Sequence, residues 1–230
     1  MRSPFLCALA AAFGLALVAS PARADDEVEA PPKPRPTPPD TRSGRPTLAA
    51  GIGYQRLFAY AEKDTPPANR NVVQSDFASW GWVPQFQLEY PFTRHFAMAG
   101  VGSFGSFTNG TSVCSDCSAK TQSFGLSAVY HLVDGIPFDP WFAFTVAYRK
   151  TELTAPTGYQ GQLGTTTYTG IDIARWTIGS DFYPAKAIGF GPYLDFGIGR
   201  YSSRSPGTIS SHAAYTAITL VGLRVVLNPF

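Results

Sequence analysis

Apolar side chains alternate with small or polar ones along most of the chain after residue 46. Residues 80–92 read WGWVPQFQLEYPF and place six apolar side chains at even positions, namely Trp80, Trp82, Phe86, Leu88, Tyr90 and Phe92. A period of two indicates a β-strand with one apolar face and one polar face. The alternation recurs in eight segments, at approximately 47–61, 77–91, 95–107, 121–134, 141–153, 168–183, 187–201 and 212–227. The pattern therefore predicts an all-β fold.

The connections between these segments alternate in length. The turns PFTR, DGIPFDP and PAKA join strands two to three, four to five and six to seven, whereas the other four connections have about ten to fifteen residues. Short turns at one rim and long loops at the other are typical of bacterial outer-membrane barrels. An even strand number also places both ends of the barrel at the short-turn rim, so a segment before residue 47 would lie in the periplasm.

The polar face of the strands is rich in glycine and carries few charges. Its charged members are three basic and three acidic residues, namely Glu89, Arg149, Arg175, Asp181, Asp195 and Arg224. A balanced, glycine-rich face suits the interior of an eight-stranded barrel, which is only wide enough for side chains to fill. The apolar face would then point to lipid.

Composition favours the same assignment of the two faces. The chain is 44% hydrophobic and only 15% charged, whereas a soluble domain usually has about 25% charged residues. A soluble barrel of lipocalin type is the alternative, but it would bury the apolar face and present a Lys/Glu-rich exterior. Aromatic side chains also gather near the strand ends, as expected of two membrane-interface belts. The belt residues are Trp80, Trp82, Tyr90, Phe92, Phe142 and Tyr148.

With these features, residues 47–230 resemble the small eight-stranded outer-membrane barrel family, the OmpA transmembrane-domain and OmpX type. The resemblance rests on pattern and implies an antiparallel transmembrane barrel of up-and-down topology in the bacterial outer membrane, surrounded by lipid and lipopolysaccharide. Gly222 followed by Val225 and Leu227 is similar to the assembly signal of such proteins. The resemblance therefore also implies handling by the barrel-assembly machinery.

The sequence of the first 46 residues predicts an export signal followed by a spacer. Residues 1–24 combine Arg2, an apolar run over 5–18 and an Ala-Arg-Ala site, which is typical of a signal peptide. A retained anchor helix is the alternative, and the run is short for one. Residues 25–46 contain seven prolines, so we expect a disordered, extended periplasmic tether. It would serve either as a spacer or as a docking strip for a periplasmic protein or the cell wall.

Two details of the strands give sharper expectations. When the hairpin between the sixth and seventh strands is centred on PAKA, Arg175 lies across from Asp195. This register predicts an ion pair inside the barrel. Pro84 and Pro192 fall in mid-strand, where a missing N–H removes a ladder hydrogen bond. We therefore expect a bulge or a broken ladder at each proline.

Few residues suggest chemistry. Cys114 and Cys117 are the only cysteines after the signal peptide, and a disulfide within the second long loop is the first interpretation. Ser210 lies two residues from His212, as Ser and His neighbour one another in barrel lipid A deacylases, but no Asp or Glu follows Asp195 to complete a triad. We find no motif for a metal or a cofactor. Without its signal peptide the chain has 16 basic and 16 acidic residues, which gives no signal for nucleic acid.

Four basic residues share the outward phase near the long-loop ends of their strands: Arg56, Lys120, Lys150 and Arg200. Two interpretations stay open, a belt that binds lipopolysaccharide phosphates and ordinary snorkelling. The sequence favours a monomeric, non-enzymatic outer-membrane protein with extracellular loops. A lipid-modifying enzyme and a narrow or gated channel are the alternatives.

Overall fold

The computed structural model describes residues 44–65, 70–77, 79–108, 117–133, 138–156, 163–185, 187–207 and 214–228. The predicted signal peptide and nearly all of the tether lie outside these residues. The elements in chain order are β1 (Thr47–Thr65), β2 (Arg70–Val73), α1 (Gln74–Phe77), β3 (Trp80–Pro91), β4 (Phe96–Thr108), β5 (Ser118–His131), β6 (Phe138–Pro156), β7 (Leu163–Ala185), β8 (Ile188–Ser205) and β9 (Tyr215–Leu227).

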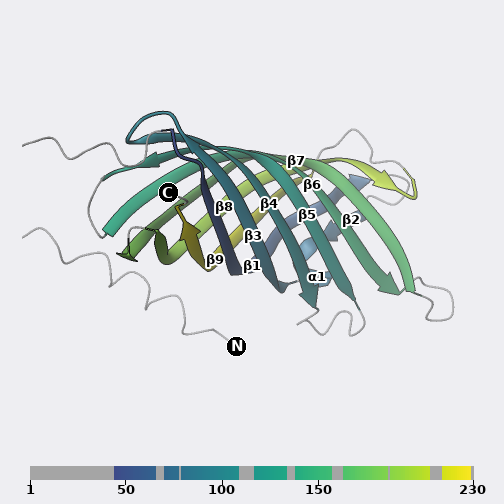
Figure 1. Ribbon diagram of the computed structural model, residues 1–230. Helices are drawn as coiled ribbons and strands as arrows, with labels where there is room; N and C mark the ends of the chain where they lie inside the picture. The colour runs from purple at the N-terminus through teal and green to yellow at the C-terminus, as the bar shows by residue number, and fades with distance from the viewer. Residues whose placement is uncertain are drawn as a thin grey trace, which may run out of the picture. The chain divides into compact units, whose positions relative to one another are not determined.

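Eight of the strands form a closed antiparallel ring (Figure 1). Each strand pairs with its neighbour in the order β1-β3-β4-β5-β6-β7-β8-β9, and pairing of β1 with β9 closes the barrel. The register of this last pair runs from Leu48 opposite Leu227 to Ala59 opposite Thr216. The predicted eight-stranded, up-and-down transmembrane barrel is confirmed. No helix among the described residues is long and apolar enough to cross a membrane.

Two predictions about the long-loop rim were wrong. The first long loop contains strand β2 and helix α1, and β2 pairs with the end of β1 through Tyr60 and Val73. Strands β6 and β7 are also longer than predicted, because their ladder continues to Pro156 opposite Leu163. The outer part of β7, LGTTTYT, is rich in threonine and lacks apolar alternation, so the hydrophobic pattern did not include it.

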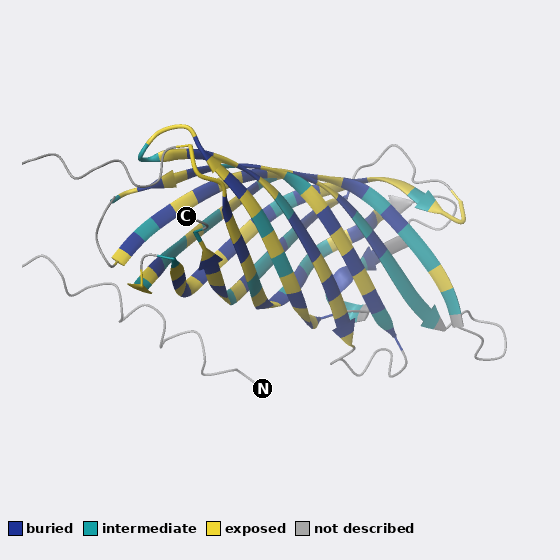
Figure 2. Cartoon of the chain, viewed as in Figure 1, coloured by how far each residue is buried: buried dark blue, intermediate teal, exposed yellow. Residues whose placement is uncertain are grey.

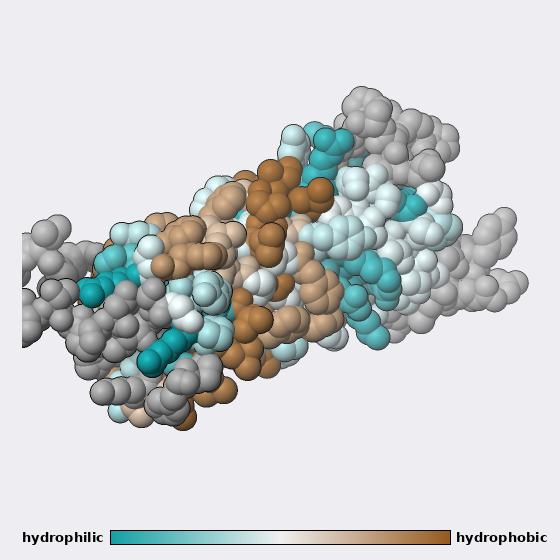
Figure 3. Space-filling model, turned by 45° about the horizontal axis from the view of Figure 1, so that its top comes forward, coloured by the Kyte–Doolittle hydropathy of each residue, from teal (hydrophilic) through white to brown (hydrophobic). Residues whose placement is uncertain are grey.

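Burial alternates along the strands and assigns the two faces (Figure 2). In β3, Val83 is buried inside the barrel, while its neighbour Trp82 keeps 60% of its surface exposed. Large apolar side chains are exposed on all eight ring strands, and one face of the molecule shows them as a band between more hydrophilic ends (Figure 3). An outward apolar band with a packed interior is the arrangement that lipid requires.

Both mid-strand prolines interrupt the sheet on one side only. Pro84 pairs with Ile52 of β1, but the β3–β4 ladder skips from Trp82 to Gln85. Pro192 likewise pairs with Leu223 of β9, whereas the β7–β8 ladder skips both Gly191 and Pro192. The missing N–H thus breaks one ladder, as predicted, and the other ladder holds the strand in the barrel.

Glycines of the inward face make room for large side chains of the next strand. A Cβ on Gly222 would lie 2.6 Å from Cζ of Tyr193, which crosses from β8. A Cβ on Gly81 would meet the ring of Phe107 of β4 at 2.5 Å. The glycine-rich face is therefore an internal packing surface.

Candidate functional site

The barrel interior contains a chain of ion pairs that links strands β6, β7 and β8. Arg149 donates from Nε to Oδ2 of Asp172 at 3.2 Å, and Nη1 of Arg175 lies 4.0 Å from the same oxygen. Arg175 also pairs with Asp195. All four side chains are at most 8% exposed. Because each charge has an opposite neighbour, burial leaves none of them isolated.

The predicted pairing of Arg175 with Asp195 is present, but the predicted register was wrong. Arg175 lies opposite Gly197, and Asp195 lies opposite Thr177, so the ion pair runs diagonally between β7 and β8. The same register already holds at Phe182 opposite Phe190, so the offset arises at the turn, where the ladder shifts between Phe182 and Ala185. A separate register shift between Asp172 and Ala174 brings both Asp172 and Arg175 inside, although one number is even and the other odd. The alternation in the sequence therefore did not predict Asp172.

A second pair lies nearer the short-turn rim. Arg224 of β9 donates from Nε to Oδ1 of Asp181 at 2.9 Å and from Nη2 to Oδ2 at 2.5 Å. The guanidinium carbon also lies 3.6 Å from the ring centroid of Trp141. This bidentate geometry fixes both charged groups, and the pair crosses the lumen between two strands that are not neighbours in the sheet.

At the short-turn rim, a histidine bridges two carboxylates. Nδ1 of His131 lies 2.8 Å from Oδ2 of Asp139, and Nε2 lies 2.9 Å from Oε1 of Glu89. Both ring nitrogens of His131 thus have a carboxylate partner, and the three side chains tie β3, β5 and β6 together. The sequence predicted Glu89 inside the barrel but not Asp139, which falls within the predicted turn DGIPFDP. The sequence signal that could have pointed to Asp139 is His131, an inward histidine without an obvious partner in the sequence.

Toward the long-loop rim, the lumen is filled by a small second core. Ala61, Val72, Tyr168 and Tyr201 pack together. Beside them, the fully buried Glu62 accepts a hydrogen bond from Tyr168 Oη at 2.7 Å and lies 3.2 Å from Nη1 of Arg204. Sequence reasoning missed Glu62 because it lies beyond the predicted end of the first strand.

The predicted balance of three basic and three acidic interior residues was therefore incomplete. All six predicted residues are buried, but the described part of the barrel buries three further carboxylates, those of Glu62, Asp139 and Asp172. His131 and the partly exposed Arg204 face these extra acids. The alternation of inward and outward residues did not predict these acids, because Asp172 lies at a strand irregularity and Glu62 and Asp139 lie near the rims.

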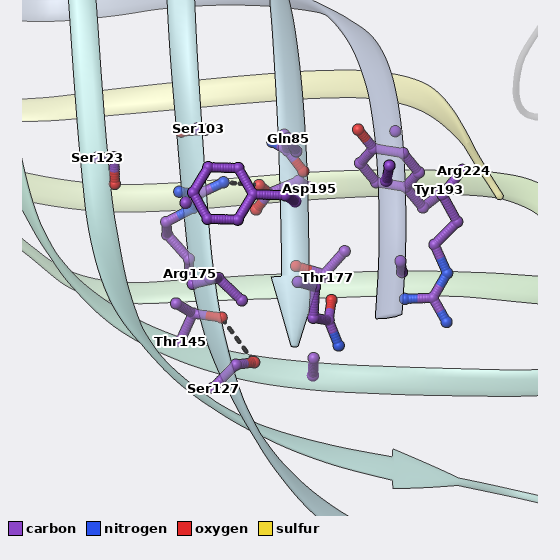
Figure 4. Close-up of a pocket in the computed structure, with 18 of the residues that line it drawn as sticks. Gln85, Ser103, Ser123, Ser127, Thr145, Arg175, Thr177, Tyr193, Asp195 and Arg224 are labelled. Carbon is purple, nitrogen blue, oxygen red and sulfur yellow. Dashed lines mark hydrogen bonds and ion pairs between the residues drawn. The ribbon is translucent and has the colours of Figure 1, made fainter. Parts of the chain in front are cut away.

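Between the ion pairs lies a chamber with a free volume of about 50 Å³ (Figure 4). All eight ring strands contribute to its lining, which combines alanine, valine and aromatic side chains with the hydroxyls of Ser103 and Ser123, the amide of Gln85, and the Arg175–Asp195 pair. Tyr193 and Arg224 complete it. Between the chamber and the short-turn rim lies the His131 group, and toward the long-loop rim lies the second core around Tyr168 and Tyr201.

The six predicted belt residues all point outward and are exposed: Trp80, Trp82, Tyr90, Phe92, Phe142 and Tyr148. On the long-loop side, Trp80 stacks on Tyr54 of β1, with ring centroids 5.0 Å apart. On the short-turn side, Tyr90 meets Phe92 edge to face at 5.3 Å. These contacts place aromatic groups at both edges of the apolar band.

The four outward basic residues differ in their surroundings. Lys150 pairs with Glu152, Nζ to Oε1 at 2.7 Å, and Glu152 also lies opposite Lys120 in the β5–β6 register. Arg56 instead lies over Phe58 and Trp80, at 4.8 and 5.1 Å from their ring centroids. Arg200 is exposed and lies opposite Tyr215. In the described part of the chain, neither Arg56 nor Arg200 forms an ion pair with a carboxylate.

The remaining candidates concern the loops. Cys117 is disulfide-bonded and buried, while Cys114 lies outside the described residues, so the pairing within the loop stays a prediction. Ser210 and His212 also lie outside them. Among the residues that the structure describes, no group of three or more His, Cys, Asp or Glu side chains is placed to hold a metal ion.

The closed ring, outward apolar band and filled lumen define the class: the fold is that of the small eight-stranded outer-membrane β-barrels. Among solved structures, the chain is similar to Neisserial surface protein A (NspA), with a TM-score of 0.51 and 11% identity over 80% of this chain and 97% of that one. It is equally similar to the outer membrane protein OprG from Pseudomonas aeruginosa, with a TM-score of 0.51 and 9% identity over 83% and 99% of the two chains. No protein-family model and no curated protein matches the sequence.

A barrel with enzymatic activity is also among the similar structures. The outer membrane protease OmpT from Escherichia coli matches with a TM-score of 0.38 and 7% identity, over 80% of this chain and 97% of that one. At that level, the likeness does not bear on the chemistry of this chain. The fold resemblance inferred from the sequence is thus confirmed, and the activity has to be argued from the residues.

Proposed function

We propose that this protein is a non-enzymatic component of the bacterial outer membrane that binds lipopolysaccharide at its long-loop rim. The observation that carries the proposal is the contrast between an apolar outer wall and a lumen filled by paired charges. In this arrangement, the long loops face outside, and residues 25–46 reach into the periplasm after removal of residues 1–24.

The filled lumen argues against a channel. An open aqueous path would need a continuous space, yet the interior is closed by Glu89–His131–Asp139 at one end and by the packed Tyr168 and Tyr201 at the other. An eight-stranded barrel has room only for such filling. We therefore propose that the barrel presents its loops at the cell surface and does not conduct ions or solutes.

The placement of polar groups argues against an enzyme as well. His131 and its two carboxylates face one another inside the barrel, where a lipid substrate does not reach. On the outer side, His95 stacks on Tyr130 at 5.8 Å and its Nδ1 lies 2.8 Å from the carbonyl oxygen of His131, so its ring is engaged by structural contacts rather than placed beside a nucleophile.

Arg56 and Arg200 are the favoured contacts for lipopolysaccharide phosphate. They lie on β1 and β8, on either side of β9, so their strands are about 10 Å apart. A guanidinium binds phosphate through two hydrogen bonds, and neither arginine is neutralised by a described carboxylate. Lys120 and Lys150 share Glu152, which weakens their attraction for a second anion.

Lipopolysaccharide that co-purifies with the folded protein tests this assignment. The double variant Arg56→Gln/Arg200→Gln should lose most of the lipid, roughly tenfold at low salt, while Lys120→Gln/Lys150→Gln serves as the charge-matched control and should lose less. Unchanged lipid in both variants would disprove the lipopolysaccharide proposal. Equal losses in both would show that the charge count, rather than the arginine pair, determines binding.

A further inference from the structure

The lining of the central chamber contains a group of polar atoms that are buried without a partner. Among the described residues, no hydrogen-bond partner exists for Gln85 Nε2, Trp141 Nε1, Arg175 Nε, Arg224 Nη1, Tyr193 Oη and Asp195 Oδ1. All six residues line the same chamber, and they come from five different strands, β3, β6, β7, β8 and β9. Buried polar groups normally have partners, so this concentration is informative.

The set is dominated by donors. The four nitrogen atoms can only donate, Tyr193 Oη can donate or accept, and Asp195 Oδ1 can only accept. Water would satisfy the nitrogens but would bring two further donors with each molecule, which would in turn need acceptors among the hydroxyls and amides of the lining. A small anion accepts several hydrogen bonds and donates none, which matches this surplus of donors.

The size of the chamber agrees with a small anion, and its charges are balanced. The charged residues of the lining are Arg175, Arg224 and Asp195, and the two guanidiniums are paired with Asp195 and Asp181 respectively, so an anion would be held by hydrogen bonds rather than by net charge. The free volume of about 50 Å³ exceeds the roughly 10–15 Å³ that one water-sized particle needs. We propose that the chamber binds one small monovalent anion of halide or nitrate size, hydrogen-bonded to the Gln85 amide, the Trp141 indole and the two guanidiniums.

The site is built into the fold and does not depend on the outer rim. Arg175 and Arg224 are each held by a carboxylate on one side, Asp195 and Asp181 respectively, which leaves other guanidinium N–H groups for the chamber. The Trp141 ring lies against the Arg224 guanidinium. Because both rims are filled, we expect the anion to enter during folding or through slow opening rather than by free exchange.

Crystals of the full chain, refolded and grown in sodium bromide, test the site directly. Anomalous diffraction should show one bromide in the chamber. In the double variant Gln85→Leu/Trp141→Phe, which removes two neutral donors, its occupancy should fall at least severalfold. The matched control is Gln55→Leu, another inward glutamine that does not line the chamber. Water alone between the donors would overturn the proposal, and so would undiminished bromide in the double variant.

Thermal unfolding gives an independent readout in solution. At constant ionic strength, replacing gluconate by bromide should raise the unfolding temperature of the wild type saturably, and the double variant should lose this response. An equal response of wild type and double variant, or none in the wild type, would refute the assigned donors. Heat-dependent gel mobility confirms that each variant is folded before either measurement.

Discussion

The Arg224–Asp181 pair allows the energetics of the lumen to be tested quantitatively. Both side chains are buried, at 7% and 1% exposure, and they meet through two hydrogen bonds. Replacing Asp181 by Asn keeps the volume but leaves the guanidinium without its counter-charge. Breaking a buried pair in this way costs about 3–5 kcal/mol. The reciprocal variant Arg224→Met leaves the carboxylate alone and should cost a similar amount.

The double variant separates pairing from simple loss of packing. With both charges removed, no group is left uncompensated, so Asp181→Asn/Arg224→Met should be less destabilised than the sum of the single variants. The coupling between contacting residues is commonly about 0.5–3 kcal/mol, and a buried bidentate pair should lie at the upper end. Reversible urea unfolding in lipid vesicles, followed by tryptophan fluorescence, measures all three free energies of unfolding.

The exposed pair of Lys150 and Glu152 is the control for this cycle. Both side chains are more than one third exposed, and solvent screens such pairs almost completely. Glu152→Gln should therefore leave the free energy of unfolding within experimental error. If Asp181→Asn were equally harmless, or if the two single effects simply added, the lumen would be solvated and the interpretation of a filled interior would be refuted.

Three further predictions follow from the barrel. Gly222→Ala should destabilise it by about 1–3 kcal/mol because the new Cβ meets Tyr193, whereas Gly100→Ala, with nothing within 4 Å, should be neutral in the same urea titration; equal effects would contradict the packing described. Planar bilayers containing the folded protein should show no discrete conductance steps, and stable single-channel openings would support the alternative function as a channel. Lipid A from cells that overproduce the protein should have an unchanged mass spectrum, since a new or missing acyl chain would establish the enzyme.

Most of the wall was predictable from sequence because lipid imposes the same rule on every strand. Leu126 and Leu223 must point outward to lipid, and their neighbours must fit a narrow interior, so alternation marks all eight strands. The alternation is required only where a strand faces lipid. Residues 163–169 of β7 stand beyond the apolar band, and β2 pairs only with the end of β1, so neither shows the pattern.

The sequence predicted several charged residues of the interior, but it did not predict which of them form ion pairs across the lumen. Parity placed Glu89 and Arg224 inside, yet their partners lie two strands away across the lumen: His131 on β5 and Asp181 on β7. Such contacts depend on how the closed ring staggers its strands, which local sequence does not express. The irregularity near Asp172 shows the same limit within one strand, because a single extra residue exchanges the two faces.

The extended ends of β6 and β7 have a consequence for what the cell presents to its surroundings. Eight residues of β6 follow Tyr148, and their ladder with β7 is continuous to Pro156. At about 3.3 Å per residue and a tilt near 45°, these strands rise roughly 20 Å above the aromatic edge. They form a hydrogen-bonded two-stranded extension beyond the apolar band. With the long loops outside, as proposed, a macromolecule that approaches the cell would reach this extension before it reaches the lipid-level surface of the barrel.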